Sequence, residues 1–77
     1  MNIKFYSRPN CELCMEGLQI LKIVQEDLPF EIDQYNIEDN DVLHEKYMLM
    51  IPVVEFKDEV IQYGRLDYPT LFEALSK

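Results

Sequence analysis

The stretch Tyr6-Ser7-Arg8-Pro9-Asn10-Cys11-Glu12-Leu13-Cys14 contains both cysteines of the chain, three positions apart. Two cysteines placed at random in a chain of this length would fall at that spacing roughly once in forty times. Residues 2–7 alternate as a short β-strand, residues 8–10 read as a turn, and Leu13 begins an apolar helical periodicity. A CxxC pair between a strand and a helix is typical of a dithiol redox centre.

The rest of the chain alternates between strand and helix patterns. Apolar residues recur at three- and four-residue steps from residue 13 to residue 28, so we expect a helix that ends before Pro29. Gly17 inside this helix costs roughly 1 kcal/mol relative to alanine, so it either marks close packing or is simply tolerated. The other predicted elements are a strand over 30–37, a short helix over 42–47, strands over 53–56 and 60–63 that form a hairpin around residues 57–59, and a last helix that opens at Asp67 and Pro69.

This order, βαβαββα, predicts an α/β fold in a single domain that spans residues 1–77. Strands joined by a helix should pair in parallel through right-handed crossovers, and the hairpin should add one antiparallel edge strand. We therefore expect a four-stranded mixed sheet with helices on both faces. The chain's 77 residues suit one domain rather than two, and an apolar fraction of 48% is typical of a globular core.

The composition narrows the range of partners. Fifteen acidic and seven basic residues give a net charge of −8, whereas phosphate binding needs clustered Lys and Arg. An acidic surface also makes anionic lipid a poor partner. No segment approaches the length of a membrane span, and the N-terminus lacks the pattern of a signal peptide. We therefore expect a cytoplasmic monomer without nucleic acid or membrane partners, whose cysteines serve catalysis or metal binding rather than a permanent disulfide.

Together these features resemble the thioredoxin-like fold, and most closely its glutaredoxin-like branch. The resemblance covers nearly the whole chain. It implies that the Ile51–Pro52 peptide bond is cis and that Pro52 faces the dithiol across a groove. The matching segments are residues 6–14, Met50-Ile51-Pro52-Val53 and Tyr63-Gly64-Arg65-Leu66-Asp67.

The chain departs from the glutaredoxin pattern in three places. Where glutaredoxins typically have Cys-Pro-Tyr-Cys, Thr-Val-Pro and Gly-Gly, this chain has Cys-Glu-Leu-Cys, Met50-Ile51-Pro52 and Tyr63-Gly64. Glutathione is anionic, and few cations besides Arg8 and Arg65 accompany the matching segments. The sequence therefore favours redox chemistry in a short, divergent member of the family, and gives weak support to glutathione as a co-substrate.

The resemblance implies a small thiol–disulfide oxidoreductase in which Cys11 is the nucleophile and Cys14 the resolving thiol. A helix N-terminus favours a thiolate at Cys11, whereas the carboxylates of Glu12 and Glu16 oppose it, and we expect the helix to prevail modestly. The other residues that the resemblance places at the site share one role, which is contact with the bound peptide or thiol. They are Arg8, the backbone of Ile51, Pro52, Gly64 and Asp67.

Several alternatives stay open at this stage. The cysteines suit an inert buried pair, a binding module without turnover, or an iron–sulfur cluster bridged between two subunits through Cys11. Zinc needs four ligands, and with His44 as the only histidine we expect no metal and no resident cofactor. Arg8 is as readily a turn residue, and Asp67 a helix N-cap. The expected partners are a disulfide-bearing protein or a low-molecular-weight thiol, and a reductase.

Overall fold

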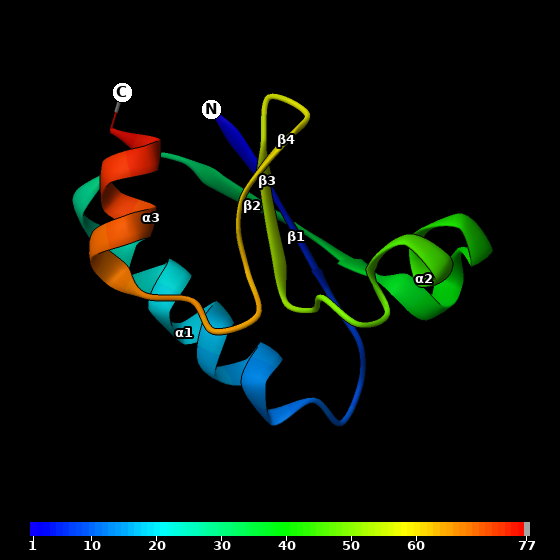
Figure 1. Cartoon of the computed structure of the whole chain (residues 1–77). Coiled ribbons are helices and arrows are strands. Elements are labelled where there is room, and N and C mark those ends of the chain that lie inside the picture. The colour runs from blue at the N-terminus through cyan, green and yellow to red at the C-terminus, as the bar shows by residue number, and fades with distance from the viewer. Residues whose placement is uncertain (77) are drawn as a thin grey trace.

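The structure, a computed structural model, describes residues 1–76 and contains one four-stranded sheet in the order β2-β1-β3-β4 (Figure 1). It confirms the α/β class and the mixed sheet with helices on both faces. The strands are β1 (Asn2–Ser7), β2 (Glu31–Asn36), β3 (Val53–Phe56) and β4 (Glu59–Tyr63). The helices are α1 (Glu12–Asp27), a 3₁₀ turn η1 (Ile37–Asp39), α2 (Asp41–Tyr47) and α3 (Tyr68–Leu75).

The direction of β3 differs from the sequence prediction. β1 and β2 pair in parallel as expected, but β3 lies antiparallel to β1 rather than parallel to its predecessor. The reason is the length of the connection. The seven residues of α2 rise only about 10 Å, whereas a six-residue strand spans about 20 Å. The chain therefore stays at the end of the sheet where β2 stops (Figure 1), and β3 has to run back from there.

The hairpin between β3 and β4 confirms the prediction, although β4 begins at Glu59, inside the predicted turn. The two turn residues, Lys57 and Asp58, both have positive φ angles of 55° and 63°. Positive φ at both central residues defines the type I′ turn, whose twist matches that of the flanking strands.

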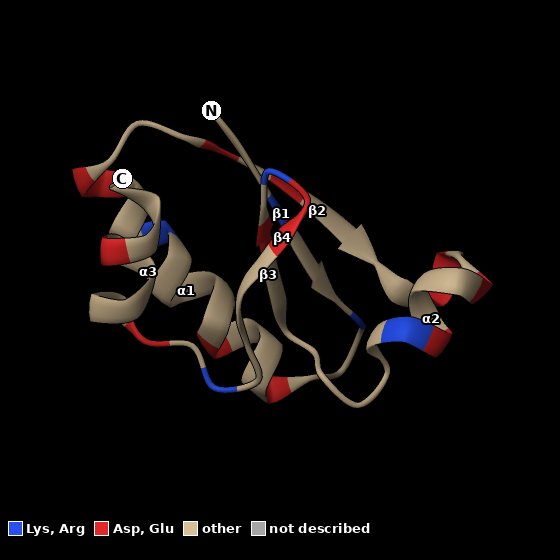
Figure 2. Cartoon of the chain, turned by 45° about the horizontal axis from the view of Figure 1, so that its top comes forward, with Lys and Arg blue, Asp and Glu red and all other residues tan. Residues whose placement is uncertain are grey.

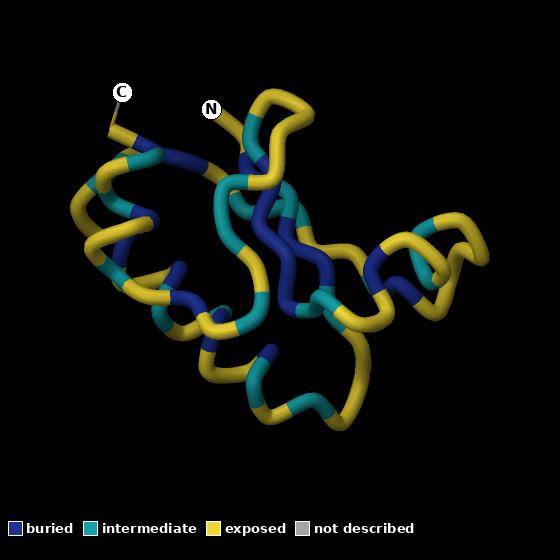
Figure 3. Tube along the Cα trace, in the orientation of Figure 1, coloured by how far each residue is buried: buried dark blue, intermediate teal, exposed yellow. Residues whose placement is uncertain are grey.

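One face of the sheet is covered by α1 and α3, which pack on β1 and β3 (Figure 1). The residues coloured as buried in Figure 3 lie along the central strands and at intervals along these helices. Burial of apolar side chains is the main favourable contribution to folding. The buried core of this face is entirely apolar and comprises Ile3, Phe5, Leu21, Val24, Phe30, Val54, Leu66, Leu71 and Leu75.

The opposite face is covered only at one end, by η1 and α2. Its buried cluster consists of Tyr6, Ile37, Tyr47 and Val53. Glu55 on β3 is the one buried charged side chain among residues 1–76, with 7% of its surface exposed. No helix within the same residues is long and apolar enough to cross a membrane.

Candidate functional site

The two cysteines lie where the turn after β1 leads into α1. Asn10 adopts a positive φ of 59°, a conformation that asparagine tolerates better than most residues, and the turn delivers Cys11 to the N-cap of the helix. The Cys11 Sγ accepts a hydrogen bond from the Cys14 backbone N–H at 3.1 Å. The two Cα atoms are 5.2 Å apart and the sulfurs form a disulfide. The CxxC spacing thus brings both sulfurs together across the first helical turn.

The two cysteines differ in exposure. Cys11 is half-buried, whereas only 3% of the Cys14 surface is exposed. Cys11 also sits at the end of the 16-residue α1 where unpaired N–H groups and the helix dipole stabilise negative charge. A reagent from solution therefore meets Cys11 first.

The loop before β3 packs against α1 one turn beyond the cysteines. Its Ile51–Pro52 bond is cis, as the resemblance implied, and Pro52 is buried. A Cβ atom placed on Gly17 would lie 3.0 Å from the Pro52 Cγ and 2.9 Å from the Leu66 Cδ1. Of the two readings of Gly17, the structure therefore supports close packing.

Gly64, which follows β4, is hydrogen-bonded to the same loop. Its N–H donates to the carbonyl oxygens of Met50, at 3.0 Å, and Pro52, at 2.8 Å. Its φ of +75° is a conformation that glycine adopts without strain. The structure thus gives Gly64 a role in fixing the loop, and its predicted contact with a bound thiol stays a prediction.

Asp67 caps α3. Its Oδ1 accepts from the Thr70 N–H at 2.9 Å, and its Oδ2 accepts from the Gln62 side-chain amide at 2.8 Å. These hydrogen bonds, that of Thr70 foremost, lower the pKa of Asp67 below its ordinary value. The N-cap alternative is therefore realised, and both carboxylate oxygens already have partners within the chain.

The two remaining sequence-predicted residues, Arg8 and Ile51, belong to different loops. Arg8 is exposed in the turn before Cys11. The resemblance assigned the backbone of Ile51 to substrate, and in the structure the Ile51 N–H donates to the Tyr47 carbonyl at 3.2 Å. No backbone hydrogen bond within residues 1–76 is found at the Ile51 carbonyl, and the contact of the Ile51 backbone with a bound peptide or thiol stays a prediction.

Sequence reasoning missed a buried carboxylate near this loop. Glu55 Oε1 accepts a hydrogen bond from the Tyr6 hydroxyl at 3.3 Å, and Oε2 accepts one from the Tyr47 hydroxyl. Burial, followed by the nearby Glu55 carboxylate, raises the pKa of Tyr6 to about 12 and also raises that of Tyr47. Both phenols therefore stay protonated and donate. Strand alternation carried the signal, because it puts Glu55 on the same face as the buried Val53.

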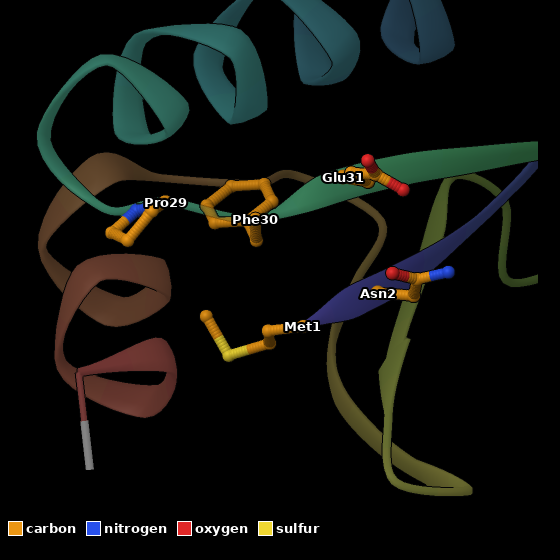
Figure 4. Close-up of a pocket in the computed structure, with 5 residues that line it drawn as sticks. All are labelled: Met1, Asn2, Pro29, Phe30 and Glu31. Carbon is orange, nitrogen blue, oxygen red and sulfur yellow. The ribbon is translucent and has the colours of Figure 1, made fainter.

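Two of the hollows lined by residues 1–76 bear on the position of the site, and only one of these two is near the cysteines. The larger, about 470 Å³, is lined by Met1, Asn2, Pro29, Phe30 and Glu31 where β1 and β2 begin (Figure 4). The cysteines follow the opposite end of β1, so this hollow is remote from them. The smaller, about 250 Å³, runs along the first turns of α1 and is lined by Glu12, Met15, Glu16 and Gln19.

The chain as a whole is acidic, and exposed charges of both signs accompany the segments of the candidate site. Acidic segments are frequent on α1 and α2 in Figure 2, and basic ones are few. Glu12 and Glu16 are exposed beside the cysteines, and Arg8 and Arg65 are exposed as well. Within residues 1–76, no three His, Cys, Asp or Glu side chains are grouped so that they could share a metal ion.

Sequence comparisons identify a family that includes nearly the whole chain. The sequence profile of the Glutaredoxin-like domain (DUF836) matches residues 2–76. A relative from Dictyostelium discoideum, named "Glutaredoxin-like protein YDR286C homolog", is 32% identical over 78 residues, which cover 94% of this chain and 72% of the relative.

Solved structures share the fold over almost the whole chain. The protein XcR50 from X. campestris superposes with a TM-score of 0.83 at 23% identity, covering 96% of this chain and 95% of that one. Protein Ne2328 from Nitrosomonas europaea gives the same TM-score at 28% identity, covering 96% and 89%. Thioredoxin 1 from Thermosipho africanus gives 0.63 at 16% identity, covering 99% and 96%.

Proposed function

Because the chain belongs to the glutaredoxin-like family, we propose that it is a thiol–disulfide oxidoreductase with Cys11 as nucleophile and Cys14 as resolving thiol. A close pair of cysteines on this fold fits a thiol redox role. The observation that carries the finer assignment is the asymmetry of the pair, since Cys11 is accessible at the helix N-cap and Cys14 is buried behind it.

In the reduced protein, the attacking species is the Cys11 thiolate. The N-terminus of α1 and the Cys14 N–H support negative charge at that sulfur. Cys11 attacks one sulfur of a substrate disulfide, forms a mixed disulfide and expels the other sulfur as a thiolate, which takes up a proton. Cys14 then loses its proton and attacks the Cys11 sulfur, which releases the second substrate thiol. The substrate gains two electrons and two protons, and the protein is left with the Cys11–Cys14 disulfide.

The proposed substrate is a disulfide-bearing protein or a low-molecular-weight disulfide, and a thiol reductant restores the dithiol. Glutathione is the less favoured reductant. Its negative charge would meet Glu12 and Glu16 beside Cys11. Asp67 already uses one carboxylate oxygen to cap α3 and the other to accept from the Gln62 side chain. We place this chemistry in the cytoplasm and in a monomer, as expected from the sequence.

Two single substitutions test the assignment. Cys14→Ser should accumulate a mixed disulfide at Cys11 when the reduced protein meets a disulfide peptide, because the resolving thiol is missing. Cys11→Ser should form none and should lose turnover. Intact-mass spectrometry detects the adduct, and release of the peptide thiol measures turnover. Glutathione disulfide and the neutral 2-hydroxyethyl disulfide, assayed in parallel, should show the slower reaction with the anionic compound.

The controls separate this function from its alternatives. Met15→Leu changes an exposed side chain next to the pair and should leave turnover near that of the wild type. Turnover in Cys11→Ser equal to that of the wild type would refute the assignment of the nucleophile. A wild-type protein that forms the adduct and expels the first thiol, but never releases the second thiol from Cys11, would instead be a binding module without turnover.

A further inference from the structure

The buried carboxylate of Glu55 has no task in the redox cycle described above. Its two oxygens accept hydrogen bonds from phenols on two different elements, Tyr6 on β1 and Tyr47 at the end of α2. No buried side-chain N or O atom within residues 1–76 lacks a hydrogen-bond partner. A carboxylate removed from water is costly unless it is hydrogen-bonded, so this arrangement depends on both donors.

Tyr47 extends the connection from Glu55 to the loop over residues 48–52. Its hydroxyl bonds to β3, and its backbone carbonyl accepts from the N–H groups of Met50, at 2.9 Å, and Ile51, at 3.2 Å. The position of this carbonyl, and hence of the two amides, follows from where Glu55 places the Tyr47 ring. The next residue in the chain is Pro52, which packs against Gly17 in α1.

We propose that Glu55 is a positioning residue for the redox site, which fixes the loop over residues 48–52 against α1 through Tyr47. The proposal rests on the function proposed above, because it makes the loop the surface against which a substrate disulfide is presented to Cys11. A carboxylate suits this role because its two oxygens satisfy two donors at once. An apolar residue would leave both phenols without partners.

Amide hydrogen exchange tests the proposal without any activity. In Glu55→Ala, the Met50 and Ile51 amides should exchange at least about tenfold faster relative to the Val24 amide in α1, as local opening requires when buried hydrogen bonds are lost. In Glu55→Gln the ratio should stay near that of the wild type, because one phenol can donate to the amide oxygen and the other can accept from the amide nitrogen. Tyr47→Phe tests the same connection if Glu55→Ala does not fold.

Separate measurement of KM and kcat distinguishes a positioning role of Glu55 from a general effect on stability. Glu55→Ala should raise KM for a disulfide peptide severalfold, while kcat stays near that of the wild type. The rate at which iodoacetamide alkylates reduced Cys11 should also stay near that of the wild type, because this small reagent reacts without contacting the loop. Ile3→Val weakens the core on the other face and serves as the matched control. It should leave KM unchanged.

The outcomes are separable. Equal acceleration at Met50, Ile51 and Val24 in Glu55→Ala would overturn the proposal, as would a Glu55→Gln protein as impaired as Glu55→Ala. If the wild type turns over no disulfide, the proposed function fails, and the exchange ratios still decide whether Glu55 fixes the loop.

Discussion

The two faces of the sheet are packed against their helices in different ways. The core cluster on the face covered by α1 and α3 has nine buried side chains, all of them apolar. The cluster on the face covered by α2 has four, of which Tyr6 and Tyr47 carry hydroxyls that bond to Glu55, a buried charged residue of the sheet. One face is joined by contact between apolar surfaces, and the other by a small set of directed hydrogen bonds.

This difference suggests that the two faces contribute differently to the free energy of folding and to the position of the loop over residues 48–52. Apolar burial is non-directional and scales with area, so the α1 face should supply most of the free energy of folding. Hydrogen bonds to a carboxylate fix distances and angles. They lie on the face where the short α2 leads into the loop over residues 48–52. The larger face therefore sets whether the chain folds, and the smaller face sets where that loop lies.

Leu21→Ala should have the largest effect. Leu21 is fully buried in α1, and its truncation should lower the free energy of unfolding by about 2–5 kcal/mol through lost burial and a cavity. Urea unfolding followed by circular dichroism measures the change. The comparison of the two faces requires that the Met50 and Ile51 amides keep their exchange rates relative to Val24. A loop that opens selectively in Leu21→Ala would contradict it.

Tyr47→Phe should have the next largest effect, because it removes a hydrogen bond to a buried carboxylate. We expect a loss of about 1.5–3 kcal/mol in the free energy of unfolding, the usual net contribution of a hydrogen bond to a charged group. Tyr6→Phe should cost less, since its hydrogen bond of 3.3 Å is long. Equal losses in the two variants would show that Tyr47 has no special place on this face.

The pH dependence of the free energy of unfolding tests the hydrogen-bonded face in the wild-type protein. Folding raises the pKa of Tyr6 from 10.0 to about 12, and it raises that of Tyr47 too, so the native state holds these protons more tightly than the unfolded state. Their stabilising contribution is therefore fully present below pH 10 and is lost as the pH rises from 10 towards 12. Urea midpoints over that range should fall in the wild type and fall less steeply in Tyr6→Phe and Tyr47→Phe.

Most of the fold could be predicted from local patterns. Helical periodicity, the CxxC position and the turn residues predicted every helix and strand except η1, with small shifts at the boundaries. The direction of β3 could not be predicted by the rule for strands joined by a helix. That rule assumes a helix long enough to return along the sheet, and α2 is too short.

The features of the candidate site also divide into those that the sequence predicts and those that only the folded sheet specifies. The cysteine pair could be predicted because its chemistry depends on residue type and spacing. The cis Ile51–Pro52 bond could be predicted because the resemblance to the family implied it. The hydrogen bonds of Glu55 could not, because they join residues 49 and 8 positions apart in the chain. Such contacts depend on the register of strands that only the folded sheet specifies.

Gly17→Ala should have the smallest effect on stability, and it acts where α1 meets the loop over residues 48–52. Alanine favours the helix by about 1 kcal/mol, but overpacking costs about 1–3 kcal/mol. The new Cβ would lie 2.9 Å from the Leu66 Cδ1 and 3.0 Å from the Pro52 Cγ. The Leu66 methyl group can turn away, whereas the proline ring is rigid, so the net result should be a loss of about 1 kcal/mol or less.

The same substitution should change activity more than stability, because the displaced atom belongs to Pro52. KM for a disulfide peptide should rise while the alkylation rate of reduced Cys11 stays constant, as in Glu55→Ala, although the loop is now disturbed from the opposite face. Gln19→Ala on the exposed side of α1 is the control and should shift stability by less than about 0.5 kcal/mol. If Gly17→Ala lowers stability and leaves KM unchanged, the contact between Pro52 and α1 contributes to packing alone, and only the α2 face positions the loop.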